Sequence, residues 1–406
     1  MKMAYTPKGI EYLRRKLNSK RSNVLTRYNF YEMKNYTFDF NISTPPDLRH
    51  WNSCVGWCAK AVDSLADRLQ FREMRNDDFA MNEIFNLNNK DIFTDSAFLS
   101  ALISSCCFTY ISADDEGYPR LQVIDGANAT GVLDPITYLL NEGYAVLERD
   151  DAGNPLLEAH FLAGETWYYP KNRQPYVIKN DAPYALLVPI INRPDAVREF
   201  GHSRISRACM SLTGSALRTI KRSEIAAEFY AFPQKYISGL SEDAEIDKWR
   251  ASMSSFLALT KDTDGDKPTI GQFTQQSMQP HLEQLKMFAA LFAGETGLTL
   301  DDLGFATDNP SSADAIKAAH ENLRLEASKA QRTFGTGLLN IGYLAACVRD
   351  KFPYRREMIY NTIPVWRPVF EPDASQLSGI GDAMLKLSQA FPDYFAVEKL
   401  ADLTGI

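Results

Sequence analysis

Apolar residues recur at helical spacing over the last third of the chain. After an irregular segment at residues 304–310, they occur at Ile316, Ala319, Leu323, Ala327, Ala330, Phe334, Leu338 and Ile341. Steps of three and four residues keep these positions on one face of a helix. Ser311 and Asp314 have the spacing of a capping box. The pattern predicts a helix from about Ser312 to Val348, about 55 Å long, which favours a mechanical element over a small-molecule pocket.

Shorter amphipathic patterns predict further helices. A basic helix is expected over residues 7–35, with Leu13, Leu17, Val24 and Leu25 as its apolar positions. Proline pairs and turn residues separate the later helical patterns. These later helices are expected at residues 51–69, 79–88, 92–106, 203–231, 249–256 and 273–292. The tail, Val365-Trp-Arg-Pro and then residues 375–406, is expected to form one or two more.

Between residues 107 and 190 the apolar period changes from helical spacing to two, which indicates β-strands. Strands are expected at residues 108–112, 120–124, 144–148, 156–162, 165–169 and 176–178, with 187–191 closing the region. Residues 114–117 and 151–155 have the composition of turns. The fold class predicted from these patterns is α+β, mainly helical, with one antiparallel β region.

Composition places the chain among globular proteins. It has 406 residues, 45% hydrophobic and 23% charged, which is enough for two or three domains. No run of eighteen apolar residues predicts a membrane span, and residues 1–7 lack the apolar core of a secretion signal. The six cysteines are scattered, so we expect reduced thiols in an intracellular fold.

Charge is distributed unevenly along the chain. Residues 1–35 hold nine Lys and Arg against two Glu, an excess of seven positive charges in a chain whose net charge is −7. The remaining body is acidic, which argues against tight binding of nucleic acid phosphates. The basic N-terminal helix is predicted either to make an electrostatic contact or to be a solvated surface helix.

No residue constellation predicts an enzyme, a cofactor or a metal site. The five histidines (His50, His160, His202, His281 and His320) are far apart and lack the spacing of zinc ligands. Residues 262–266 lack the glycine and closing glutamate of a calcium loop and favour a hairpin turn. Asp301 and Asp302 fit helix capping better than catalysis. Neither a phosphate-binding Gly-x-x-x-x-Gly-Lys motif nor a Gly-x-Ser-x-Gly motif occurs.

Several sequence blocks follow one another in order along almost the whole chain. The most legible is Val188-Pro-Ile-Ile-Asn192-Arg-Pro followed by Phe200-Gly-His-Ser-Arg-Ile205. The other blocks are Tyr28-Asn-Phe-Tyr31, Trp51-Asn52, residues 62–69, 86–108 and 309–316, Trp366-Arg-Pro, and residues 382–387. Together these blocks resemble the portal proteins of tailed bacteriophages, the siphophage-type head-to-tail connectors. His202 stands where arginine or another residue is expected, and many relatives have a glycine near Cys106–Cys107.

This resemblance implies a ring of identical subunits, usually twelve, at one vertex of the viral capsid. Its expected partners are double-stranded DNA in the channel, the large terminase subunit, a head-tail adaptor, and the major capsid and scaffold proteins. It implies location in the virion, with assembly in the host cytoplasm, and no membrane. In such a ring, the basic N-terminal helix is expected to meet an acidic neighbour or capsid surface. The portal regions implied are a wing at residues 1–200, stem helices at 201–232 and 273–303 around a clip at 233–272, a tunnel loop at 304–312, the long wing helix at 313–350, and a short crown at 351–406.

The resemblance also assigns candidate contact residues. The DNA-facing tunnel loop would present Phe305, Ala306, Thr307, Asp308, Asn309 and Pro310. The clip would contact terminase or adaptor through Tyr236, Ser238, Glu242, Trp249 and Asp264. The predicted function is a non-enzymatic conduit for DNA during packaging and ejection. Two alternatives remain open: a DNA-binding enzyme that processes nucleic acid, and an unrelated intracellular scaffold.

Overall fold

The computed structural model describes residues 5–35, 53–231, 235–238, 269–272, 277–305, 318–370 and 374–390. The chain divides into two compact units. The larger unit comprises residues 1–35, 56–210 and 293–406, and the smaller unit comprises residues 36–55 and 211–292. The architecture is mixed α+β with antiparallel sheets, as the sequence predicted.

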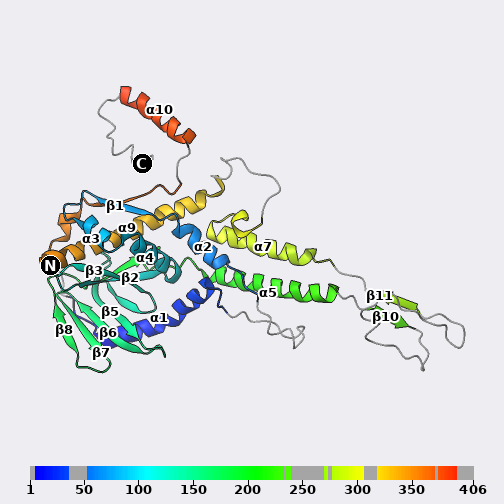
Figure 1. Cartoon of the computed structure of the whole chain (residues 1–406), viewed down its shortest axis with the longest axis horizontal. Coiled ribbons are helices and arrows are strands. Elements are labelled where there is room, and N and C mark those ends of the chain that lie inside the picture. The colour runs from blue at the N-terminus through cyan, green and yellow to red at the C-terminus, as the bar shows by residue number, and fades with distance from the viewer. Residues whose placement is uncertain are drawn as a thin grey trace. The chain divides into compact units, whose positions relative to one another are not determined.

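Two antiparallel sheets form the β region of the larger unit (Figure 1). One has the strand order β4-β5-β6-β7-β8, and the other has β3-β2-β9. The strands of the first sheet are β4 (Ala129–Leu133), β5 (Leu140–Arg149), β6 (Pro155–Leu162), β7 (Glu165–Pro170) and β8 (Tyr176–Lys179). The strands of the second sheet are β3 (Pro119–Asp125), β2 (Cys106–Ala113) and β9 (Leu187–Ile191). The predicted antiparallel region is therefore confirmed, but it is two sheets, and β4 was not predicted.

Helix α9 (Glu321–Asp350) is the central helix of the larger unit. The predicted stripe is confirmed from Leu323 to Ile341, because all six of its residues there are buried, whereas Ala319 is exposed. Toward its C-terminal end α9 becomes buried on nearly every side. Gly337 permits this packing, since a Cβ there would lie 3.0 Å from the Ile190 side chain in β9. The predicted start of this helix, with Ile316 and the Ser311 cap, lies outside the described residues.

The larger unit has further helices besides α9. They are α1 (Ile10–Tyr31), α2 (Trp57–Ala66), α3 (Met81–Leu87), α4 (Lys90–Ser104) and α10 (Ala374–Ala390), with short 3-10 turns at Asp301–Leu303 and Arg356–Ile359. Helix α2 begins at Trp57 and not at Trp51, because residues 53–56 are not helical. The tail helix is confirmed as α10, and residues 391–406 lie outside the described residues.

Helix α1 docks on the five-stranded sheet through one apolar stripe. Leu13 and Leu17 pack against Tyr144 and Val146 of β5. Leu25, predicted as part of the same stripe, is 40% exposed. That prediction was wrong because one residue step turns a helix by about 100°, which carries Leu25 away from the buried Val24.

A two-stranded antiparallel sheet joins distant parts of the chain. Strand β1 (Phe71–Arg75) pairs with β12 (Ile363–Trp366), with Phe71 opposite Trp366. Neither strand was predicted, and the segment around Val365 was wrongly assigned to the helical tail. A register shift between Phe71 and Glu73 breaks the alternation that would have indicated a strand.

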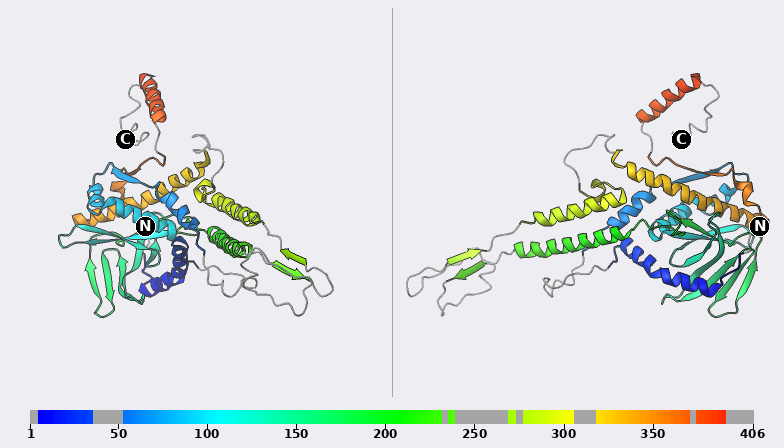
Figure 2. Two further views of the ribbon diagram at one scale, coloured as in Figure 1. Left: turned by 45° about the vertical axis from the view of Figure 1, so that its right-hand side comes forward. Right: turned by 180° about the vertical axis from the view of Figure 1, so that it is seen from behind.

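The smaller unit contains a pair of helices and a hairpin. Helices α5 (Arg207–Ala231) and α7 (Gln279–Thr296) lie side by side, as both views of Figure 2 show. The Thr219 hydroxyl donates a 3.1 Å hydrogen bond to the Gln284 side chain between them. Strand β10 (Lys235–Ser238) pairs with β11 (Thr269–Gln272). Both predicted helices are confirmed with later starts, whereas the predicted helix at 249–256 and the turn at 262–266 lie outside the described residues.

Candidate functional site

The segment after β9 forms a tight junction at the block most typical of portal proteins. The His202 N–H donates to the Asn192 carbonyl, and the Asn192 side-chain amide donates back to the His202 carbonyl, both at 2.8 Å. Gly201 lies between them at φ +71°, and a Cβ there would lie 2.0 Å from the Asn192 carbonyl oxygen. Only glycine fits this position, because the conformation and the close backbone approach both exclude a side chain.

The next two residues of the block attach the junction to the end of α4. The Ser203 hydroxyl donates to the Ile103 carbonyl at 2.6 Å, and the Arg204 N–H donates to the Leu102 carbonyl at 2.8 Å. The last carbonyls of a helix have no partner within the helix itself. The block therefore caps α4 from a part of the chain about one hundred residues away.

The Arg204 side chain connects three further parts of the larger unit. It is 8% exposed, forms an ion pair with Glu326 of α9, and donates to the carbonyls of Thr296 and Ala61. A buried guanidinium is tolerated when its N–H groups have acceptors, and removing one partner leaves a costly unpaired charge. The block was recognisable in the sequence, but no structural role could be assigned to it there. The Gly-x-Ser-Arg order was the signal that could have indicated this role.

A buried carboxylate fixes the N-terminal segment, and sequence reasoning missed it. Glu142 of β5 is fully buried and accepts from the Tyr5 hydroxyl, the backbone N–H groups of Lys8 and Gly9, and the His160 ring, at 2.7 to 2.8 Å. Burial alone would raise the pKa of Glu142, but these bonds outweigh it and lower the pKa. In the sequence, the only sign of this buried carboxylate was an acidic residue within the apolar run of β5.

The candidate tunnel loop begins directly after a 3-10 turn. The Thr299 N–H and hydroxyl both donate to the Asp302 carboxylate at 2.9 Å, so Asp302 is in contact with the turn's start, as the capping prediction expected. Gly304 ends the turn at φ +88°, and the Phe305 N–H donates to the Leu300 carbonyl. The other predicted loop residues, Ala306, Thr307, Asp308, Asn309 and Pro310, lie outside the described residues.

Two of the five candidate clip residues are described. Tyr236 and Ser238 lie in β10, opposite Gly271 and Thr269 of β11. Glu242, Trp249 and Asp264 lie outside the described residues. The structure thus brings the first two onto one short strand and leaves the contact surface as a prediction.

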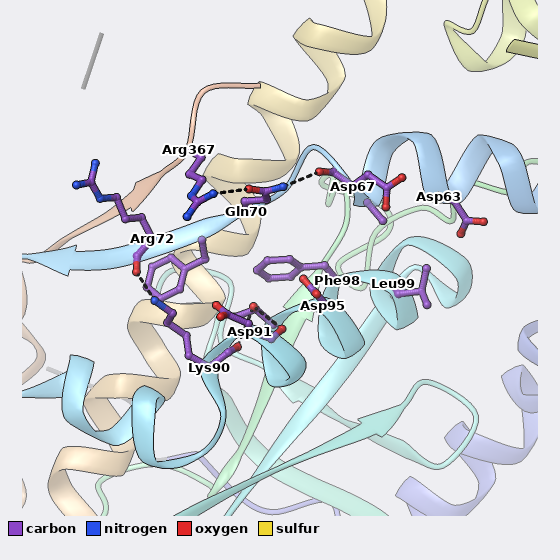
Figure 3. Close-up of a pocket in the computed structure, with 13 residues that line it drawn as sticks. Asp63, Asp67, Gln70, Arg72, Lys90, Asp91, Asp95, Phe98, Leu99 and Arg367 are labelled. Carbon is purple, nitrogen blue, oxygen red and sulfur yellow. Dashed lines mark hydrogen bonds between the residues drawn. The ribbon is translucent and has the colours of Figure 1, made fainter. Parts of the chain in front are cut away.

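A pocket of about 640 Å³ near α2 and α4 collects charged side chains, as Figure 3 shows. Its acidic residues are Asp63, Asp67, Asp91 and Asp95, and its basic residues are Arg72, Lys90 and Arg367. Burial, and then the carboxylates of Asp91 and Asp67, raise the pKa of Asp95. Within the described part of the chain, no group of three or more His, Cys, Asp or Glu is arranged to hold a metal ion.

The described histidines and cysteines have structural or surface surroundings. His160 pairs with the buried Glu142, and His202 bonds to Asp195 at 2.6 Å at the surface. None of the six cysteines, which all lie among the described residues, is in a disulfide, and five of them are buried. Among the described helices, none is both long enough and apolar enough to cross a membrane.

The described residues thus form a mixed α+β protein. In it, the sequence block that most resembles portal proteins is a structural junction. No family model matches the chain. It is 24% identical to the portal protein of Mycobacterium phage D29 over 335 residues, which cover 77% of this chain and 69% of that protein. It is also 24% identical to the portal protein of Mycobacterium phage L5, over 77% of this chain and 68% of that protein. These relatives confirm the predicted resemblance to portal proteins.

Solved structures with a similar chain come from gene transfer agent particles. One is the neck of the native particle computed with C12 symmetry, with a TM-score of 0.46 and 12% identity over 86% of this chain and 89% of that one. Another is the virion of the native particle, with a TM-score of 0.45 and 10% identity over the same shares of the two chains.

Proposed function

We propose that this chain is a portal protein, the subunit of a ring at one capsid vertex. The ring conducts double-stranded DNA during packaging and ejection and is the docking site for terminase and head-tail connector proteins. The observation that carries the proposal is the similarity to two portal proteins over 77% of the chain. It agrees with the order of the sequence blocks from Tyr28 to the tail.

The division of the chain supports the proposed regions. The paired helices and the hairpin belong to a unit that includes residues 211–292, the span in which the resemblance implies stem and clip. The larger unit contains the sheets and α9, where the resemblance implies a wing. The proposed regions would therefore be separate mechanical parts of each subunit.

An exposed apolar pair on α7 supports assembly. Met287 and Leu291 lie four residues apart on one face of this helix, and each is more than half exposed. Apolar patches of this kind favour contact with another protein. In a closed ring, where each subunit uses two different surfaces, a neighbouring subunit would cover this face.

The proposed path of DNA runs past the loop that follows Gly304. A conduit should contact its cargo weakly, because each fixed phosphate contact adds affinity and salt dependence. Residues 305–310 contain Asp308 and no Lys or Arg, which suits a sliding contact. ATP hydrolysis would be supplied by the terminase.

Shortening the loop tests this assignment. We expect deletion of residues 306–308 to leave ring assembly unchanged and to reduce DNA packaging, because the loop would contact DNA and not the neighbouring subunit. Rings are scored by electron microscopy, and packaging is scored as nuclease-protected DNA in particles built with the shortened chain. Loss of rings would show that the loop is structural, and normal packaging would show that it does not act on DNA.

A further inference from the structure

A cavity of about 450 Å³ lies between α1, the end of α4 and residues 196–201, all within the larger unit. Four cations line it: Lys16, Lys20 and Arg27 from α1, and Arg198 from the segment before the junction. Glu199 is the one carboxylate among the described residues that line it. The cavity therefore carries an excess of three positive charges.

The one carboxylate is already engaged. Lys16 Nζ lies 3.0 Å from Glu199 Oε1 and also donates to the Gly131 carbonyl at 2.8 Å. Lys16 and Lys20 lie over the Phe200 ring, at 4.9 and 5.7 Å from its centre. Contact with the ring explains the position of the two lysines, but it does not neutralise their charge.

The two arginines are not explained by packing. Arg27 Nε is buried and has no hydrogen-bond partner among the described residues. Burial lowers the pKa of Arg27, and the nearby charge of Arg198 lowers it further. Arg198 contacts only a ring nitrogen of His202, at 3.3 Å, through its own side chain within the described residues. Among the described residues, the two guanidinium groups thus share a concave site in which no carboxylate pairs with either of them.

We infer that this cavity binds a free phosphate-class oxyanion. A buried N–H without a partner is costly, and a dianion in the cavity would satisfy the Arg27 Nε and relieve its repulsion with Arg198. Guanidinium groups form paired hydrogen bonds with phosphate oxygens, and ammonium groups add point charges. The volume lies within the range of small-ligand sites. The inference is independent of the proposed function.

Phosphate binding to the full chain tests the inference. The probe is sodium phosphate, measured by titration calorimetry and by thermal unfolding against sodium chloride of equal ionic strength. We expect phosphate to raise the melting temperature of the unmodified chain more than chloride does, because a ligand of the folded state stabilises it. Absence of a phosphate-specific shift together with absence of binding heat would overturn the inference.

Three substitutions locate the site. Arg27→Gln and, separately, Lys20→Gln should each weaken phosphate binding by about tenfold, the loss typical of one charge-assisted contact. Lys20 is exposed, so its variant keeps the fold even if the Arg27 variant does not. Arg15→Gln is the matched control, because Arg15 is an exposed cation on the same helix that does not line the cavity. Equal binding by Lys20→Gln and the unmodified chain, or an equal loss in Arg15→Gln, would contradict the assignment.

Discussion

At the scale of single residues, the portal-like block is explained by geometry that a sequence cannot display. The order Phe200-Gly-His-Ser-Arg-Ile205 was recognisable before the structure was known. What each residue contacts was not, because Gly201 meets Asn192 and Ser203 meets the end of α4 only after folding. The block is a joint between elements, and its glycine is required by a backbone contact.

Gly201→Ala should therefore destabilise the chain more than an ordinary glycine substitution. A Cβ at Gly201 would meet the Asn192 carbonyl oxygen at 2.0 Å, so we expect a loss of about 3 kcal/mol or more in the free energy of unfolding. Gly153→Ala is the control, since Gly153 has φ +81° with no atom within 4 Å of the added Cβ, and should cost only about 1 kcal/mol. Urea unfolding measures both, and equal losses would refute the backbone contact as the cause.

The Glu142 cluster predicts how stability depends on pH. Because the pKa of Glu142 is lowered in the folded state, its carboxylate adds stability at neutral pH that is lost as the pH falls through the folded-state pKa. Glu142→Gln should cost about 3 kcal/mol at pH 7, because the Lys8 and Gly9 N–H groups lose their anionic acceptor.

The measurement is the free energy of unfolding of both chains from pH 7 to pH 3. We expect the difference between the two chains to shrink toward acidic pH, as the native carboxylate becomes protonated. A difference that stays constant over this range would mean that the charge of Glu142 does not contribute to stability.

At the scale of elements, local patterns predicted helices well and distant pairings poorly. The apolar stripe predicted for α9 is confirmed, because burial follows the helical period from Leu323 to Ile341. Strands β1 and β12 were missed because Phe71 pairs with Trp366, almost three hundred residues away, across a register shift. No local window contains that information, and the same holds for the end of α4, which is capped by Ser203 and Arg204.

Helix α9 offers a direct test of its central place in the core. Phe334 is fully buried and stacks on Phe98 of α4 with ring centres 5.0 Å apart. Phe334→Ala should reduce the free energy of unfolding by about 3–5 kcal/mol, because it leaves a cavity between two packed helices. Leu325→Ala, on the same helix but 45% exposed, should cost less than about 1 kcal/mol. Similar losses at the two positions, measured by chemical unfolding, would contradict the assigned core face.

At the scale of the whole molecule, ion pairs within the chain explain part of the uneven charge distribution. The basic N-terminal helix is not simply free to meet a partner, since Arg14 pairs with Glu158 of β6 and Lys16 pairs with Glu199. Arg15 and Lys20 remain exposed on it. The predicted contact with an acidic neighbour or capsid surface stays a prediction, now confined to fewer side chains.

The proposed portal regions would depend on neighbouring subunits, which a single chain's sequence does not contain. The helix pattern predicted α5 and α7, but the exposed face of Met287 and Leu291 became visible only once burial was known. In a monomer that face stays exposed to solvent, whereas a closed ring would bury it at every contact between neighbouring subunits. The central claim is therefore assembly, and it can be tested without a virus.

Single-particle electron microscopy of the purified full chain, together with its native mass, tests the claim most directly. We expect closed rings of identical subunits around a central hole, with a mass that is an integer multiple of 45.8 kDa. A stable monomer of that mass, particularly one that cleaves DNA in the presence of a metal ion, would contradict the portal assignment.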